Sequence, residues 1–319
     1  MPSGEIVLRG FLRQLELLER QPRERAVDCS RPPEGGLPRR VMRGRRTRAF
    51  TNSQRPLDGL LTWRGGERDA VWACCRRSTR TGWGAYGPDS SAAALRGALS
   101  AGVDGLESDV CLTADGALVL LHDPYLPVGT DLEGFAHERT ARELRRARLR
   151  DREGRLTAEA PLFVEDLLAA APREVVLQFE VKAHADPALA RRTVDALAER
   201  LRGRTCGQRI EVLSFTAAAC ARAAELDCAT RLVVWADYAP AALVRWARRH
   251  GVGGVCVEHF LLSPPLMRAL RGGGLSITTG TLNEPALLDR IVPLRPDAVT
   301  SDRPHTLREA AAGVPALAA

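Results

Sequence analysis

The sequence predicts an α/β protein in which residues 70–310 form one (β/α)₈ TIM barrel. Short apolar runs alternate with helical stretches eight times from residue 70 onward, as strands and helices alternate in such a barrel. Charged side chains gather where several of these runs end, and a barrel carries its reactive groups at the carboxyl ends of its strands. A doubly wound open sheet is the alternative architecture.

Eight apolar runs are expected to form the strands. They cover residues 70–75, 105–110, 175–181, 210–215, 231–235, 253–257, 275–279 and 297–300. Such short, nearly continuous apolar runs are typical of parallel strands that are buried on both faces. Most of the segments between them have helical spacing and are rich in alanine, leucine and arginine; these are residues 91–100, 187–202, 217–226, 240–250, 264–271 and 284–291.

Residues 1–69 differ from the rest of the chain and predict a basic N-terminal extension that is partly disordered. Residues 1–70 carry fifteen arginines against nine acidic residues, so they account for six of the seven units of net positive charge. Six arginines fall within residues 39–48, a density typical of a solvated arm. We expect no nucleic-acid partner, because no aromatic residue for base stacking is interleaved in this run. Binding of RNA or of a membrane surface through residues 39–48 is the alternative. Residues 311–319 are expected to be a short tail.

Cysteine usage and hydropathy predict a cytoplasmic protein. The eight cysteines form no C-x-x-C pair, and several lie inside apolar runs, where a reduced cysteine acts as a small hydrophobic side chain. We find no secretory segment and no apolar run long enough to span a membrane. With 45% hydrophobic residues over 319 positions, the chain can bury a large core.

Lys182 is the only lysine among 46 basic residues. It follows Glu180 by two positions in a predicted strand, so both side chains project from the same face. An ammonium is a compact charge that fits a crowded polar pocket, whereas a guanidinium is a wide planar fork. The pair therefore indicates part of a site, and an in-strand ion pair without a function is the alternative.

Three carboxylates and a histidine end neighbouring runs. Glu107 and Asp109 are two residues apart at the end of one strand, Glu180 ends the next, and His122 with Asp123 closes the run ALVLL. Carboxylate ligands favour Mg²⁺ or Ca²⁺ over zinc. A lysine and a histidine beside such an ion suit an anionic, oxygen-rich substrate such as a phosphate ester. Each residue, taken alone, also has a purely structural interpretation.

Residues 101–126, AGVDGLESDVCLTADGALVLLHDPYL, resemble the core motif of the glycerophosphodiester phosphodiesterases, G-x-D-x-x-E-x-D-V-x-x-T-x-D-G-x-x-V-x-x-H-D. Four further segments resemble family motifs in the same order: APLFVEDLLAA at 160–170, LQFEVK at 177–182, TLNEP at 281–285 and TSDRP at 300–304. The resemblance implies a TIM barrel of the phospholipase-C-like phosphodiesterase type. It also implies metal-dependent hydrolysis of a glycerophosphodiester or of a similar lipid-headgroup ester.

The resemblance assigns roles to five residues. Glu107, Asp109 and Glu180 would bind a divalent cation, Lys182 would neutralise the phosphodiester, and His122 would be a general acid or base. The expected partner is thus a small phosphodiester.

The chain departs from the family at the first strand, where H-R-G is expected. Either Cys75 replaces the histidine, with Arg76 at the arginine position beside the phosphate, or spacing from Pro88 places Arg80 there. Neighbouring arginines are expected to lower the pKa of the Cys75 thiol, so Cys75 is a candidate replacement base. His259 is another candidate.

Two other positions also differ from the family pattern. This chain has P-D-S-S where the family has P-E-N-T, and it has Gly280 where the family has a tryptophan. Losing one general acid or base typically costs a factor of about 10² to 10⁴ in rate. Two functions therefore stay open: an active phosphodiesterase, or a catalytically impaired barrel that binds a phosphorylated ligand or a protein.

Overall fold

The computed structural model describes residues 71–74, 86–183, 186–202, 208–236 and 238–312. Of the residues singled out from sequence, Cys75, Arg76 and Arg80 lie outside these ranges, as do the N-terminal extension and residues 313–319.

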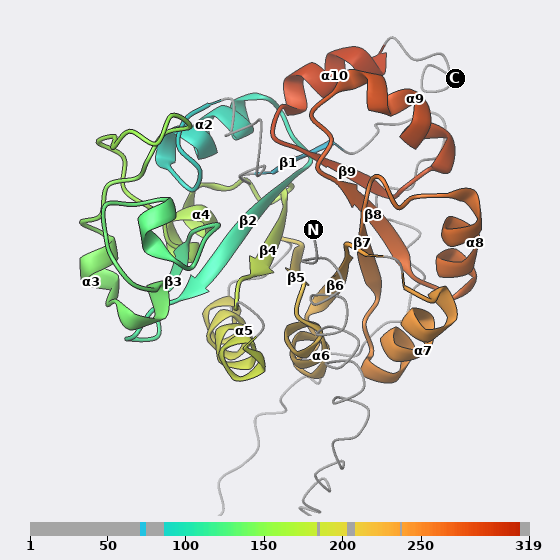
Figure 1. Ribbon diagram of the computed structural model, residues 1–319, viewed down its shortest axis with the longest axis horizontal. Helices are drawn as coiled ribbons and strands as arrows, with labels where there is room; N and C mark the ends of the chain where they lie inside the picture. Colours follow the sequence, from blue (N-terminus) through green and yellow to red (C-terminus); the bar gives the residue numbers. More distant parts are fainter. Residues whose placement is uncertain (1–70, 75–85, 184–185, 203–207, 237, 313–319) are drawn as a thin grey trace, which may run out of the picture. The chain divides into compact units, whose positions relative to one another are not determined.

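The described strands form a closed parallel barrel. One nine-stranded sheet has the order β1-β9-β8-β7-β6-β5-β4-β2-β3, and an additional β1–β2 pairing joins its ends into a ring of eight parallel strands (Figure 1). The ring strands are β1 (Val71–Cys74), β2 (Gly105–Leu112), β4 (Val176–Val181), β5 (Ile210–Ser214), β6 (Ala229–Val234), β7 (Gly254–Glu258), β8 (Ser276–Gly280) and β9 (Ala298–Ser301). The predicted (β/α)₈ barrel is confirmed, and the open sheet is excluded.

A ninth strand, β3 (Leu118–Leu120), is antiparallel to β2 and was not predicted. The lower half of β2 pairs with β1, up to Glu107 opposite Cys74. Its upper half, from Val110 to Leu112, pairs with β3 instead. Because β2 is longer than β1, β3 takes the neighbouring position beyond the end of β1.

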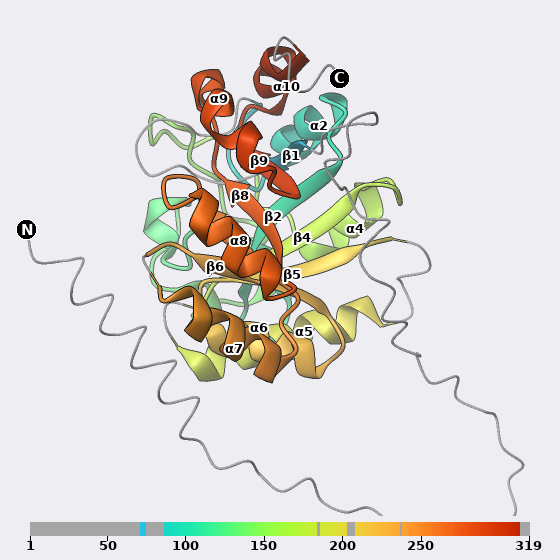
Figure 2. The ribbon, with the colours of Figure 1, turned by 90° about the vertical axis from the view of Figure 1, so that its right-hand side faces the viewer.

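Helices cover the outside of the ring, and Figure 2 shows α7 and α8 in front of the strands. They are α2 (Ala92–Ser100), α3 (Ala141–Leu144), α4 (Val164–Ala170), α5 (Pro187–Leu201), α6 (Ala217–Glu225), α7 (Pro240–His250), α8 (Pro264–Gly272), α9 (Leu288–Ile291) and α10 (Pro304–Ala312). The predicted helix at 284–291 consists of a 3₁₀ turn, Pro285–Leu287, followed by α9. No helix in the described ranges is both long and apolar enough to cross a bilayer.

Local sequence explains where these helices begin and end. Ser91 caps α2 by accepting a hydrogen bond from the backbone N–H of Ala94 at 3.0 Å. Proline occupies the first turn of α5, α7 and α8, where its missing N–H costs no helical hydrogen bond. Gly251 ends α7 with a φ of 70°, a left-handed conformation that favours glycine.

Strand alternation divides the buried residues into two sets. Leu106, Val110 and Phe179 belong to an apolar core that they share with helical residues such as Val194 and Leu197 of α5. The residues between them on β2 and β4 are Glu107, Asp109, Gln178 and Glu180, all at most 1% exposed. Since neighbouring strand residues face opposite ways, the polar set lies on the inner face of the barrel.

Below the strand ends, the barrel interior contains a buried ionic network. Arg231 of β6 donates to Glu211 of β5 at 2.7 and 3.3 Å and to Ser276 of β8 at 2.9 Å. Gln178 of β4 donates to Glu211 at 3.1 Å, and Arg209 also pairs with Glu211. Burial alone would raise the pKa of Glu211, but Arg231 and Arg209 outweigh it and lower that pKa to about 2.

We predict that Glu211→Gln destabilises the barrel by about 3 to 5 kcal/mol near neutral pH, because it leaves the Arg231 charge buried without its carboxylate. A depressed pKa stabilises the fold above the unfolded value and loses that effect below it. The difference in unfolding free energy between wild type and variant should therefore shrink as the pH falls from 4.5 towards 2.

Denaturant unfolding as a function of pH measures this difference. The control is Glu153→Gln, which removes an exposed carboxylate and should cost less than about 1 kcal/mol. A Glu211→Gln variant as stable as this control would show that the network does not stabilise the fold.

Candidate active site

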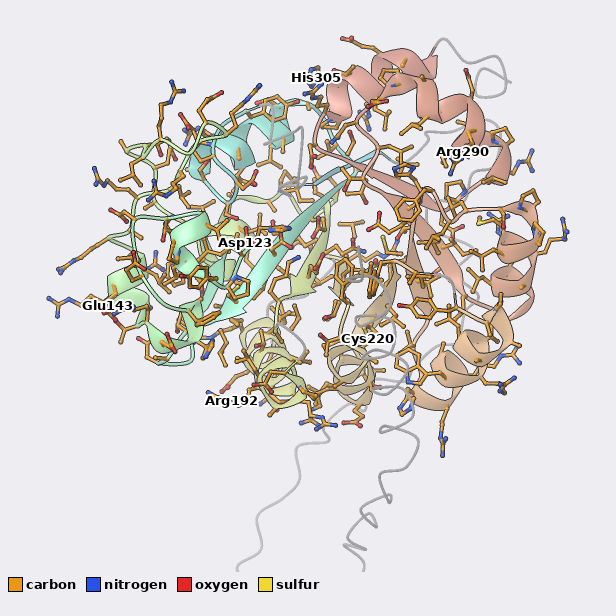
Figure 3. The ribbon with its side chains drawn as sticks, viewed as in Figure 1. Asp123, Glu143, Arg192, Cys220, Arg290 and His305 are labelled. Carbon is orange, nitrogen blue, oxygen red and sulfur yellow. The ribbon has the colours of Figure 1, made fainter. Side chains whose placement is uncertain are left out.

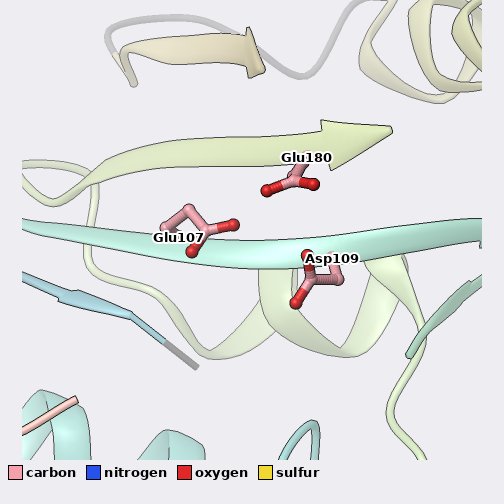
Figure 4. Close-up of side chains that lie close together, drawn as sticks. All are labelled: Glu107, Asp109 and Glu180. Carbon is pink, nitrogen blue, oxygen red and sulfur yellow. The ribbon is translucent and has the colours of Figure 1, made fainter. Parts of the chain in front are cut away.

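Three carboxylates meet where the middle of β2 runs beside the carboxyl end of β4 (Figure 4). Asp109 is paired in register with Glu180 on the neighbouring strand, and Glu107 lies two residues earlier on β2. One oxygen from each of the three side chains lies within 4.8 Å of the other two. The carboxylates predicted from sequence to converge therefore do so, on one rim of the barrel.

Lys182 lies directly against this cluster. Its Nζ is 2.5 Å from an oxygen of Glu180 and 3.0 Å from an oxygen of Asp109. The backbone N–H of Lys182 donates to the carbonyl of Val110 at 3.0 Å, which fixes the residue beside β2 just beyond the end of β4. The lysine thus bridges carboxylates from two strands and is 14% exposed.

The charge of this cluster fits a bound cation. Glu107, Asp109 and Glu180 are each at most 1% exposed, and Lys182 forms ion pairs with Asp109 and Glu180. Buried carboxylates repel one another and are costly to desolvate. Carboxylate oxygens are the ligands that hard divalent cations prefer, so these three residues could hold such an ion.

His122 is placed beside Asp109 by the backbone. Leu121, the preceding residue, donates its N–H to the carbonyl of Asp109 at 3.1 Å. The Nδ1 of His122 lies 3.2 Å from a carboxylate oxygen of Asp123, and the His122 side chain is 20% exposed. Figure 3 shows Asp123 beside β2. Thus β3 brings the histidine to the same strand end as the carboxylates while leaving it open to solvent.

The loops after β8 and β9 are tied together at the same end of the barrel. Asn283 donates from its side-chain amide to Asp302 at 2.7 Å and accepts from the backbone N–H of Asp302 at 2.9 Å. The hydroxyl of Ser301 accepts from the backbone N–H of Arg303 at 3.0 Å. These contacts give the TLNEP and TSDRP segments a structural role.

Two sequence departures are clarified by the structure. A Cβ at Gly280 would lie 2.8 Å from the Cβ of Thr300, so a tryptophan there would require Thr300 to move. His259, the other candidate replacement base, lies in the turn that follows β7, and its side chain is partly buried. Its carbonyl accepts from Arg290 at 2.6 Å, and its pKa is lowered by burial and by that arginine.

Sequence reasoning missed the side chains on the opposite half of the barrel mouth. Phe215, Trp235 and Glu258 lie at or just past the ends of β5, β6 and β7, and by strand alternation they face the interior. The signal was available, because each lies at or next to the last residue of a predicted strand. Only His259, as a candidate replacement base, was identified from sequence at the ends of these three runs.

Comparison with known proteins agrees with this geometry. Residues 81–306 match the model of the glycerophosphoryl diester phosphodiesterase family. The chain belongs to this family. It is 24% identical over 226 residues to a glycerophosphodiester phosphodiesterase of Caldanaerobacter subterraneus, covering 69% of this chain and 90% of that protein. A probable glycerophosphodiester phosphodiesterase 2 of Mycobacterium tuberculosis is 26% identical over 236 residues, 70% of this chain and 84% of that one.

Solved structures of glycerophosphodiester phosphodiesterases share the fold. A phosphodiesterase from Oleispira antarctica, solved in complex with the product sn-glycerol-3-phosphate, superposes with a TM-score of 0.66 at 22% identity. The alignment covers 76% of this chain and 96% of that chain. The recognition of a divergent family member from its sequence motifs is therefore confirmed.

We predict that a divalent cation raises the melting temperature of the protein, because it binds the converged carboxylates of the native state and not the unfolded chain. At about 100 times the dissociation constant the gain is about 2.7 kcal/mol, or several degrees. Glu180→Gln should remove most of it, as measured by thermal unfolding with Mg²⁺, with Ca²⁺ and with EDTA.

The control for this prediction is Glu165→Gln on α4, a partly exposed carboxylate 3.2 Å from Arg200. This variant should keep the full gain. Equal stabilisation of wild type and Glu180→Gln would show that the cation binds somewhere else.

Proposed function

We propose that the protein is a metal-dependent phosphodiesterase that hydrolyses a glycerophosphodiester or a similar lipid-headgroup ester. The observation that carries this proposal is the convergence of Glu107, Asp109 and Glu180 within 4.8 Å, with Lys182 bridging two of them. A cluster of this kind presents a divalent cation and an ammonium side by side, and a phosphodiester is an anion that both would attract. Membership of the family supports the same reaction.

Glu107, Asp109 and Glu180 would hold the cation, for which the all-carboxylate donor set favours Mg²⁺ or Ca²⁺. Once bound, the cation would supply positive charge next to the non-bridging oxygens of the phosphate. Lys182 adds a second positive charge that is fixed by two ion pairs. As negative charge builds up on phosphorus-bound oxygens, a preorganised ammonium stabilises it without reorganising solvent.

His122 would transfer a proton during the reaction. It is held next to Asp109 by β3, it is partly exposed, and Asp123 at 3.2 Å from Nδ1 can orient the ring. One alkoxide must be protonated as it leaves, or one attacking hydroxyl deprotonated, and an oriented imidazole serves either purpose. From sequence, Cys75 is proposed as the second proton-transfer group and Arg76 as a further phosphate ligand.

A second function remains in view because the first motif histidine is replaced. In that case the barrel binds a phosphorylated ligand or a protein but turns substrate over slowly or not at all. The two functions share the cation and Lys182 and differ in whether proton transfer is efficient.

We predict release of glycerol 3-phosphate or free alcohol from glycerophosphodiesters with Mg²⁺ or Ca²⁺, and none with EDTA. His122→Gln should lower kcat by about 10² to 10⁴ and remove one limb of the pH–rate profile, since a proton-transfer group is lost. The control is His137→Gln, an exposed histidine that stacks on Phe135 and should leave the rate unchanged. Tight binding of a glycerophosphodiester without any turnover would favour the binding function.

We predict that Lys182→Arg weakens phosphate binding although it keeps the charge. A guanidinium is too wide for a position that contacts Glu180 and Asp109 at once and is only 14% exposed. A loss of about tenfold in affinity for glycerol 3-phosphate, at an unchanged melting temperature, is the expected result. If the arginine variant binds this ligand as tightly as the wild type does, the compact ammonium has no special role.

A further inference from the structure

Two neighbouring helices on one side of the barrel carry an unbalanced positive charge. Residues 240–272, from the start of α7 to the end of α8, contain five arginines and a single acidic residue, Glu258. Glu258 belongs to β7, so neither helix has an acidic side chain of its own. Figure 2 shows the two helices packed side by side on the outside of the ring.

Arginines on other parts of the surface pair with carboxylates. Arg222 of α6 lies 2.7 Å from Asp195 of α5, and Arg148 lies 3.0 Å from Asp131. None of the five arginines of α7 and α8 forms an ion pair with a described residue. The positive charge of these two helices is therefore not neutralised by neighbouring side chains in the part of the chain that the structure describes.

Two of the five arginines hold the ends of helices. Arg248 donates from Nε to the carbonyl of Gly273 at 3.0 Å, and Arg271 donates to the carbonyl of Arg295. Both contacts satisfy backbone carbonyls where a helix ends. The three other arginines are exposed and have no hydrogen-bonded or charged partner among the described residues: Arg245, Arg249 and Arg268.

An exposed aromatic side chain lies where α8 begins. Phe260, in the turn between β7 and α8, is 58% exposed, more than any other large apolar side chain among the described residues. Pro264 and Pro265, the first residues of α8, are exposed as well. Because α8 follows the carboxyl end of β7, these three residues lie at the rim of the barrel mouth.

The three arginines lie a short way behind this rim. An α-helix rises about 1.5 Å per residue, so Arg268 lies about 6 Å along α8 from Pro264, and Arg245 about 8 Å along α7 from Pro240. Arg249 lies one turn beyond Arg245. The headgroup layer of a bilayer is about 5 to 7 Å deep on each side. An aromatic ring that enters the acyl boundary at the rim would therefore bring the guanidinium groups to the lipid phosphates.

We propose that Phe260, Arg245, Arg249 and Arg268 form a docking surface for an anionic lipid bilayer, with the barrel mouth turned towards the membrane. Interfacial binding combines an apolar group that enters the bilayer with basic side chains that reach the phosphates. A nucleic acid would use the arginines but would give the exposed prolines no role. Docking does not require hydrolysis, so this proposal and the proposed function can fail separately.

Co-sedimentation of the full chain with vesicles tests the docking surface. One set of vesicles contains phosphatidylcholine mixed with anionic phosphatidylglycerol, and the other contains phosphatidylcholine alone. EDTA is present, so that no divalent cation links the protein to the lipid. The wild type should partition onto the mixed vesicles at least about tenfold more strongly than onto the neutral ones, and added salt should weaken this binding.

Arginine substitutions separate this face from the rest of the basic surface. The triple variant Arg245→Gln, Arg249→Gln, Arg268→Gln should lower partition onto the mixed vesicles by about 10- to 100-fold, since each arginine near an anionic surface contributes about fivefold. Its rate on a water-soluble glycerophosphodiester should not change, because these arginines lie on the outer helices. The control variant removes the same charge from exposed arginines outside this face: Arg142→Gln, Arg146→Gln and Arg192→Gln.

A further variant tests the apolar contact. Phe260→Ala should lower partition by about 5- to 20-fold, because the ring no longer enters the bilayer. Leu156→Ala is the matched control, since Leu156 is another exposed large apolar side chain, at 37%, between β3 and α4. It should leave partition unchanged. Melting temperatures show whether all variants are folded.

Wild-type partition by the arginine triple variant or by Phe260→Ala would overturn the docking surface, and the binding that persists would then come from another basic segment. Equal binding to charged and neutral vesicles would overturn it too. Tight binding of single-stranded RNA, without partition onto the mixed vesicles, would assign the arginines to a nucleic acid instead. None of these outcomes contradicts the proposed phosphodiesterase, which the hydrolysis assay tests by itself.

Discussion

The arrangement of the barrel mouth depends on one electrostatic constraint, the burial of three carboxylates around a single ammonium. Glu107, Asp109 and Glu180 are almost completely buried, and Lys182 contacts two of them. Like charges this close are tolerated only where opposite charge is supplied. Lys182 supplies part of this opposite charge, and the three carboxylates lie close enough together that they could also hold a metal ion.

Buried carboxylates are compensated differently at two levels of the barrel interior. At the lower level, Glu211 is neutralised by Arg231 and Arg209, and its pKa falls to about 2. That network is closed and leaves nothing for a ligand, so it stabilises the barrel. At the level above, Lys182 pairs with two of the three clustered carboxylates, and the three together could hold a metal ion. Stability and function are thus separated along the barrel axis.

The strand β3 explains how a histidine joins this site without belonging to a barrel strand. Because β2 extends further than β1, the last residues of β2 pair with β3 instead. The chain then continues through Leu121, which contacts Asp109, to His122. The family motif of residues 101–126 is therefore one structural unit: a strand that carries two carboxylates, a turn, and a short return strand that delivers the imidazole. Divergence at the first motif leaves this unit unchanged, so His122 stays beside the carboxylates of β2.

Sequence alone determined the eight barrel strands, the convergence of Glu107, Asp109, Glu180 and Lys182, and the family. It could do so because the side-chain direction of a strand residue and its distance from the strand end can both be read from the local sequence. In a barrel of repeated strands and helices, these two properties fix where the side chain lies. The pairing of β3 with β2 was decided only by tertiary structure, since a three-residue run has no periodicity that distinguishes a return strand from a loop. The same holds for the packing of Phe215 and Trp235 against the buried residues of β5, β6 and β7. Their proximity depends on register between strands distant in sequence, and register arises from closure of the ring.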